Sequence, residues 1–154
     1  MAHIHEKIDF TATVFVVFKD KVLVRKHDKY GIWLGVGGHI ELDEDPNQAA
    51  VREVKEEVGL DVVLVGNPKP EGLGSGKYQE LLPPKFLNRH FVNDLHEHVD
   101  LIYFATSESD HVIPENTTDE WHWFSKEDLE RNEQGIRVDI LNYAKAALAE
   151  LGRA

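Results

Sequence analysis

The segment from Gly38 to Leu60 constrains this chain more than any other feature of its sequence. It reads GHIELDEDPNQAAVREVKEEVGL, in which the spacing of glycine, glutamate, the Arg-Glu pair and the Glu-Glu pair matches the pattern GX5EX7REUXEEXGU, with U a bulky aliphatic residue. Because each fixed residue type has about 7% usage or less, a chance match is on the order of 10⁻⁹ per starting site. The pattern is therefore specific evidence about both local structure and chemistry.

The second half of this segment predicts a helix with a defined start and end. Asp45 can cap the first N–H groups, Pro46 suits the first helical position, and Gln48 completes a capping-box pair. Gly59 supplies the left-handed residue that ends a helix. At 100° per residue, one arc that can pack on a sheet collects small and aliphatic residues: Ala50, Val51, Val54 and Val58.

A second arc of the same helix carries Glu53, Glu56 and Glu57 at spacings i, i+3 and i+4. Like charges this close destabilise a helix, so the arrangement indicates a bound cation. Carboxylate oxygens suit hard divalent ions such as Mg²⁺ or Mn²⁺. A solvated acidic face is the alternative, and the loop before the helix and the glycine after it favour the metal site. Arg52, one turn before Glu56, can hold a carboxylate in place.

The rest of the chain predicts one α/β domain over residues 1–154, with mixed strands and helices on the faces. Runs of β-branched and aromatic residues predict strands at 10–18, 22–24, 60–65, 99–105 and 121–124. Residues 31–38 are too glycine-rich for a helix and can bring backbone close to a ligand. Capping and periodicity predict helices from Ser125 through Leu129 and over about 138–151.

A long segment at 66–98 holds four of the six prolines and is interpreted as an extended loop, either functional or an ordinary surface excursion. Its side chains include several that can stack on a base or hold a phosphate, namely Lys77, Tyr78, Lys85, Phe86, Arg89 and His90.

The composition of the chain excludes several classes of function. The 154 residues carry a net charge of −11, which argues against broad binding to nucleic acids or anionic membranes. There is no cysteine, and no run approaches the roughly 18 apolar residues of a membrane span. The first residues, MAHIHEKID, lack the apolar stretch of a signal peptide. We therefore expect a soluble protein of the cytoplasm.

The 23-residue segment resembles the signature of the Nudix hydrolases, and the flanking sequence resembles them more loosely. The resemblance implies an α/β/α sandwich around a mixed sheet. It implies hydrolysis of a nucleoside diphosphate linked to another group, X, by attack of water on phosphorus. It also implies a cofactor of two to three Mg²⁺ or Mn²⁺ ions. Where many relatives have Pro-Gly-Gly before the helix, this chain has Val36-Gly37-Gly38, so the loop loses one stiff φ angle.

By the same resemblance, Glu53, Glu56 and Glu57 are the metal ligands, together with the backbone carbonyl of Gly37. Arg52 would orient Glu53, and Glu44 would brace the loop onto the helix. Many relatives also use an acid outside this segment as a ligand or base, before a late tryptophan. Glu120, three residues before Trp123, fits that place best, with Glu115 and Asp119 as rivals.

Substrate contacts are less constrained. Arg25 belongs to the densest basic cluster, which either attracts phosphate or only keeps a hairpin soluble, and His39 could approach a phosphate from the loop. Tyr78 lies 18 residues past Leu60, which resembles dinucleoside polyphosphate hydrolases, while Arg89 is a further candidate phosphate ligand. The proline that marks many ADP-ribose hydrolases is absent, because Ser75 and Gly76 occupy that region. Nucleoside triphosphates and nucleotide sugars remain open.

Three further possibilities concern catalysis, zinc binding and oligomeric state. A sensor of the same fold would bind nucleotide without cleaving it, but such proteins usually lose acids that this chain keeps. The alternating His96 and His98, with His90 near them, suggest zinc, yet surface or core histidines are favoured because a closed zinc site needs four ligands and cysteine is absent. A homodimer is common in the family, although no residue here indicates one.

Overall fold

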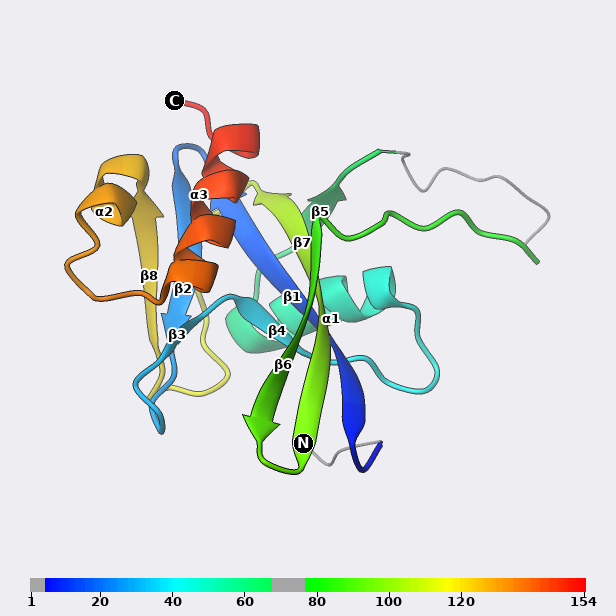
Figure 1. Ribbon diagram of the computed structural model, residues 1–154. Coiled ribbons are helices and arrows are strands. Elements are labelled where there is room, and N and C mark those ends of the chain that lie inside the picture. The colour runs from blue at the N-terminus through cyan, green and yellow to red at the C-terminus, as the bar shows by residue number, and fades with distance from the viewer. Residues whose placement is uncertain (1–4, 68–76) are drawn as a thin grey trace.

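The computed structural model describes residues 5–67 and 77–154, which form a mixed sheet between helices (Figure 1). The elements follow one another as β1 (Ile8–Phe18), β2 (Lys21–Lys26), β3 (Trp33–Leu34), β4 (Val36–His39), α1 (Pro46–Val58), β5 (Val62–Val65), β6 (Phe86–Asn93), β7 (His96–Ser107), β8 (Glu120–Ser125), α2 (Lys126–Arg131) and α3 (Val138–Leu151). The predicted α/β class with a mixed sheet is confirmed.

Strand β1 organises the sheet and creates the opening in which the site lies. Its residues 8–17 pair in parallel with 97–106 of β7, while the other strand pairs are antiparallel. On its other edge β1 pairs with β2 only through Val17 and Phe18, and with β4 through residues 11–14. Strands β2 and β4 thus share one edge of β1 and diverge from each other.

The two faces of the sheet bury separate apolar cores because side chains alternate along β1. Val14 and Val16 pack toward α1, in a cluster with the apolar residues of that helix. Phe15 and Val17 pack on the opposite face with Ile140 and its neighbours on α3. Helices α1 and α3 therefore cover opposite faces, as the sandwich requires (Figure 1).

Helix α1 begins and ends where the sequence predicts, but its buried arc differs from the predicted one. Asp45 and Gln48 form a complete capping box, and Gly59 has φ 71°. Val51 is 39% exposed, so its assignment to the packed arc is wrong, and Ala49 is buried instead. The reason is that the buried arc is centred nearer to Glu53 and Glu57, which puts Val51 just beyond its edge at about 100° per residue.

The predicted loop at 66–98 is also corrected. Residues 86–93 form β6, an edge strand paired with β7, and β7 itself begins at His96. Strand β6 was missed because most of its residues are exposed, so its sequence lacks the alternation of a half-buried strand. Residues 68–76, with Ser75 and Gly76, lie outside the described residues.

The two C-terminal helices are confirmed. Ser125 and Asp128 form a capping box on α2, and α3 covers Val138–Leu151 with Gly152 as its C-cap. Within the described ranges, every helix is too short or too polar to cross a bilayer.

Candidate functional site

Helix α1 brings Glu53, Glu56 and Glu57 to the opening between β2 and β4. Their side chains are 3%, 50% and 16% exposed, respectively. Glu53 and Glu57 thus lie on the arc that packs on the sheet, whereas Glu56 lies at its rim. Glu53 is buried and Glu57 is half-buried beside the strands, which is costly for charged groups unless a cation compensates them.

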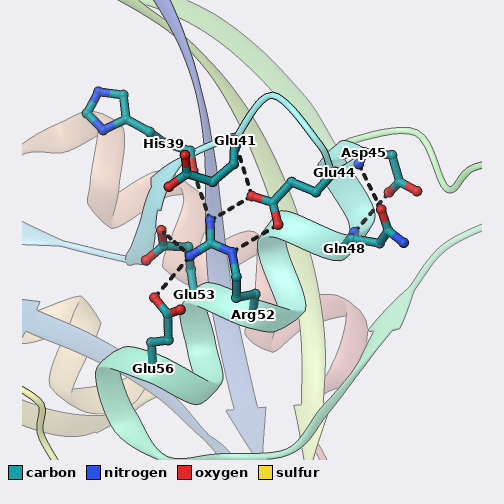
Figure 2. A network of polar contacts seen from close by, with 8 residues as sticks. All are labelled: His39, Glu41, Glu44, Asp45, Gln48, Arg52, Glu53 and Glu56. Atoms are coloured by element: carbon teal, nitrogen blue, oxygen red, sulfur yellow. Dashed lines mark hydrogen bonds and ion pairs between the residues drawn. The ribbon is translucent and has the colours of Figure 1, made fainter. Parts of the chain in front are cut away.

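Arg52 holds this acidic group together with the loop before the helix (Figure 2). Its Nε and Nη2 donate to the two oxygens of Glu44 at 2.9 and 2.7 Å. Its Nη1 donates to Glu53 Oε1 at 3.1 Å and to Glu56 Oε2 at 3.0 Å, and Nη2 also donates to the backbone carbonyl of His39 at 3.1 Å. The hydrogen bonds from Arg52 lower the pKa of Glu44 and raise that of Arg52. The planar guanidinium therefore fixes the positions of three carboxylates and one carbonyl.

Gly37 and Gly38 allow the strand to approach the carboxylates closely. A Cβ on Gly38 would lie 2.5 Å from Glu53 Cδ and 2.7 Å from its Oε2, so only glycine leaves room for this carboxylate. A Cβ on Gly37 would instead collide with the backbone of β1, at the carbonyl of Ala12 and 2.9 Å from Thr13 Cα. The backbone N–H of Gly37 donates to Glu57, which places this residue at the acidic group.

The three glutamates open into one cavity of about 170 Å³. Its remaining lining residues come from β2 and the residue after it, from the segment before β8, and from β8 itself: Arg25, His27, Glu115, Asn116, Asp119 and Trp121. Glu57 Oε2 is buried and has no hydrogen-bond partner among the described residues. A buried carboxylate oxygen that faces other carboxylates is what a hard divalent cation requires, so these residues fit Mg²⁺ or Mn²⁺.

The raised pKa values of Glu53 and Glu57 also indicate that this site needs a bound cation. Burial raises the pKa of Glu53, and it raises the pKa of Glu57 to about 8, with the Glu53 carboxylate adding to the effect. The Arg25 guanidinium, 3.8 Å from Glu57 Oε2, acts in the opposite direction but does not cancel the burial. The site therefore lacks positive charge when no cation is bound.

Because the carboxylate of Glu57 lacks a compensating positive charge, we predict that the stability of the cation-free protein depends on pH. The pKa of Glu57 in the folded protein, about 8, lies above its ordinary value of 4.5, so its protonation stabilises the fold fully below the ordinary value. That contribution is lost as the pH rises through about 8. As the pH rises from 4.5 to about 8, we expect the melting temperature of the cation-free wild type to fall relative to that of Glu57→Gln. Over the same pH range, the increase in melting temperature that Mg²⁺ causes in the wild type should grow. A difference between the two proteins that stays constant with pH would contradict the assignment.

Arg25 lies at the edge of the acidic cavity, between an acid and an aromatic ring. Its Nη1 donates to Asp119 Oδ2 at 3.1 Å, and its guanidinium lies 5.6 Å from the ring centre of Trp121. Asp119 is itself buried and accepts from the backbone N–H of Asp28 at 2.9 Å. His27, Asp28 and Asp119 present ligand atoms within 4.8 Å of one another, and two members of this group, His27 and Asp119, line the cavity.

Comparisons with known proteins agree with this geometry. The family model of the NUDIX domain matches residues 9–142. The chain belongs to the NUDIX hydrolase family. It is 38% identical to a solved hydrolase of this family from Clostridium perfringens, with a TM-score of 0.83, over 92% of this chain and 97% of that one.

Curated relatives of this NUDIX chain are more distant. An RNA pyrophosphohydrolase of Gluconacetobacter diazotrophicus is 27% identical over 71% of this chain and 66% of its own length. An octanoyltransferase of Myxococcus xanthus is 36% identical over 43% of this chain and 18% of its own length. The chain thus spans less than two thirds of either curated relative.

Among the acids outside α1, the structure separates the three candidates. Glu115 and Asp119 line the cavity of the NUDIX glutamates, and the backbone N–H of Glu115 donates to the carbonyl of Glu57 at 2.9 Å. Glu120 is exposed on β8, opposite Lys26, and does not line that cavity. The sequence could not show which of the three acids lies near the glutamates of α1, because all three fall within six consecutive residues.

The expected substrate contacts divide in a similar way. Arg25 and His39 line cavities beside the glycines of the NUDIX loop. Tyr78 is exposed and donates to Glu80 at 2.6 Å, and Arg89 is exposed with its Nε 3.2 Å from Glu97 Oε1. Neither Tyr78 nor Arg89 lines the cavities that hold Arg25.

A second cavity, of about 200 Å³, adjoins the first at Arg25 and continues along the α3 face of the sheet. Its floor includes Asp100, which accepts from Thr11 Oγ1 at 3.0 Å and from Thr13 Oγ1 at 2.8 Å. Burial raises the pKa of Asp100. The entry of α3 forms the opposite wall through Arg137, Asp139, Ile140 and Tyr143. This cavity could not be predicted from the sequence, since its lining comes from seven separate elements.

Proposed function

We propose that this chain is a metal-dependent pyrophosphohydrolase that cleaves a nucleoside diphosphate linked to another group. The observation that carries this proposal is the convergence of Glu53, Glu56 and Glu57 on one cavity, where burial raises the pKa of both Glu53 and Glu57. Membership of the NUDIX hydrolase family supports the same reaction class. The RNA pyrophosphohydrolase relative is named for this kind of bond cleavage.

The three glutamates and the backbone carbonyl of Gly37 would hold two to three Mg²⁺ or Mn²⁺ ions. When bound, such ions neutralise the negative charge that develops on pyrophosphate oxygens during in-line displacement. Arg52 aims Glu53 and Glu56 at the cavity, and Glu44 keeps Arg52 itself in place. Glu115, exposed at the mouth of the cavity, is placed to accept a proton from the attacking water in preference to Glu120.

Two adjoining cavities suggest how the substrate lies. Its phosphates would occupy the acidic cavity, with Arg25 as the cationic contact at the junction of the two. The nucleoside or the group X would extend past Gly37 and His39 into the second cavity. With a net charge of −11 the chain lacks the basic surface for a long polynucleotide, so we propose small nucleotides as substrates.

A substrate panel tests this proposal. Product formation is measured from nucleoside triphosphates, dinucleoside polyphosphates, ADP-ribose, nucleotide sugars and RNA with a 5′-triphosphate, with Mg²⁺, Mn²⁺ or chelator. We expect cleavage that requires the divalent ion and is lost in Glu57→Gln, with the preferred member naming X. Nucleotide binding without turnover on the panel would favour a sensor of the same fold instead.

A further inference from the structure

Asp119 is a buried acid on the wall of the acidic cavity that takes no part in the proposed metal site. It lies just before β8, and its side chain is 2% exposed. Each of its carboxylate oxygens accepts a hydrogen bond, Oδ1 from the backbone N–H of Asp28 at 2.9 Å and Oδ2 from Arg25 Nη1 at 3.1 Å. A buried carboxylate needs such partners to remain charged, so these two donors account for its position.

Arg25 is the cation that this carboxylate holds. The register of β2 with β8 places Arg25 opposite Trp121, and its guanidinium lies 5.6 Å from the centre of that ring. The side chain of Arg25 is only 16% exposed. A planar guanidinium that contacts both an aromatic ring and a carboxylate has few orientations open to it. The ring of Trp121 and the carboxylate of Asp119 therefore fix the direction of its remaining donors.

A second carboxylate competes for the same guanidinium. Glu57 Oε2 lies 3.8 Å from Arg25 Nη1, which is too far for a hydrogen bond but within the range of an ion pair. In the described part of the chain, Asp119 and Glu57 are the carboxylates within 4.0 Å of this guanidinium. Glu57 is also a proposed ligand of the divalent ion, and a guanidinium bonded to it would compete with the ion. The hydrogen bond to Asp119 keeps Arg25 away from that position.

Arg25 also has a donor that the protein does not use. Its Nη1 is bonded to Asp119, whereas its Nε is buried and has no hydrogen-bond partner within residues 5–67 and 77–154. A buried donor of this kind is costly unless an acceptor reaches it. Arg25 lines both the acidic cavity and the second cavity, so an anion at their junction can supply that acceptor. Phosphate oxygens suit the fork of N–H groups on a guanidinium.

From these contacts we infer that Asp119 is a positioning residue that acts through Arg25 in two ways. It directs the guanidinium toward a phosphate of the substrate at the junction of the two cavities, and it keeps the same group away from the metal ligand Glu57. This inference rests on the proposed function, because it requires an ion at Glu57 and a phosphate beside it. Asp119 is then neither a metal ligand nor a base, since both of its oxygens already accept hydrogen bonds from the protein.

A double-mutant cycle separates this role from metal ligation. Asp119→Asn removes the charge that holds Arg25, so the guanidinium should pair with Glu57 and compete with the ion there. The double variant Arg25→Met/Asp119→Asn removes the competing cation as well and leaves neither charge of the pair unpaired. If Asp119 acts through Arg25, the metal affinity that is lost in Asp119→Asn returns in the double variant, whereas the phosphate affinity does not. A lost metal ligand would instead weaken metal binding in both variants.

The test uses the full chain after chelator treatment and dialysis, with two probes that need no turnover. Mn²⁺ alone, and inorganic pyrophosphate in the presence of Mg²⁺, are titrated by calorimetry into the wild type, both single variants and the double variant. We expect Asp119→Asn to weaken pyrophosphate binding at least about 10-fold and Mn²⁺ binding about 3-fold or more. The double variant should bind Mn²⁺ within about 2-fold of the wild type, while its pyrophosphate binding stays weak.

The matched control is Glu133→Gln, which removes an exposed acid 3.5 Å from Arg131 Nε, outside both cavities. It should bind both probes as the wild type does. Circular dichroism checks that every variant is folded, and the double variant gives the deciding comparison with the wild type if a single variant is not.

Three results would overturn the proposal. Mn²⁺ affinity that is lost equally in Asp119→Asn and in the double variant would make Asp119 a metal ligand. Pyrophosphate binding that is unchanged in the double variant, or absent from the wild type, would remove the role of Arg25. A lower melting temperature with both dissociation constants unchanged would confine Asp119 to folding. If the expected binding results are obtained but the substrate panel gives no turnover, the hydrolase is contradicted and this role of Asp119 is retained.

Discussion

Replacing Glu57 with Gln, or Glu53 with Gln, is expected to reduce kcat by at least about 10²–10⁴-fold while the fold is retained. Both side chains line the wall of the acidic cavity, Glu53 buried and Glu57 half-buried, so each substitution removes one negative charge from the position where a divalent ion is needed. Gln keeps the shape of Glu, and at Glu57 it also removes the cost of burying an uncompensated carboxylate. Initial rates at saturating Mg²⁺, with melting curves of the same samples, measure both effects.

The matched control is Glu130→Gln on α2, an exposed glutamate that lines neither cavity of the proposed site. It should keep wild-type kcat. A parallel comparison of Glu115→Gln with Glu120→Gln identifies the acid outside α1, and the larger loss is expected at Glu115. Full activity in both the Glu53 and the Glu57 variant would exclude these residues as the catalytic metal ligands. Loss of folding in both variants, measured by circular dichroism, would count against the assignment.

Local signals in the sequence predicted the elements that hold the site. The capping residues of α1 and the glycine at its end act within a few positions of each other, so both helix bounds could be read directly. The spacing of Glu53, Glu56 and Glu57 likewise follows from helix geometry alone. What that spacing could not reveal is that Glu53 and Glu57 lie on the buried arc, because the direction of the sheet relative to the helix depends on tertiary packing.

Contacts between residues far apart in the sequence could not be predicted either, because they too depend on tertiary packing. Strand β6 has an exposed pattern and is defined by its pairing with β7. The choice between Glu115 and Glu120 depends on how the segment before β8 returns to α1, through the backbone hydrogen bond from Glu115 to Glu57. The contacts of Asp9 with His39 and His96 depend on the register of β1 with β4 and with β7.

Adding one methyl group at Gly38 is expected to remove most activity while the protein stays folded. The new Cβ of Gly38→Ala would lie 2.5 Å from Glu53 Cδ, too close for the carboxylate to keep its position. The end of a glutamate side chain can rotate away at little cost to the fold, but it would then leave Arg52 Nη1, which donates to it at 3.1 Å. We expect kcat to fall at least about 10²-fold, with weaker activation by Mg²⁺.

Gly37→Ala is the matched comparison, because it adds the same methyl group one residue earlier and meets different atoms. There the Cβ would collide with the carbonyl of Ala12 and the Cα of Thr13, which belong to the backbone of β1 and cannot rotate away. Gly37→Ala should therefore lower the melting temperature markedly, whereas Gly38→Ala should change it little. If Gly38→Ala kept wild-type kcat, the observed position of Glu53 against β4 would not be the one that catalysis requires.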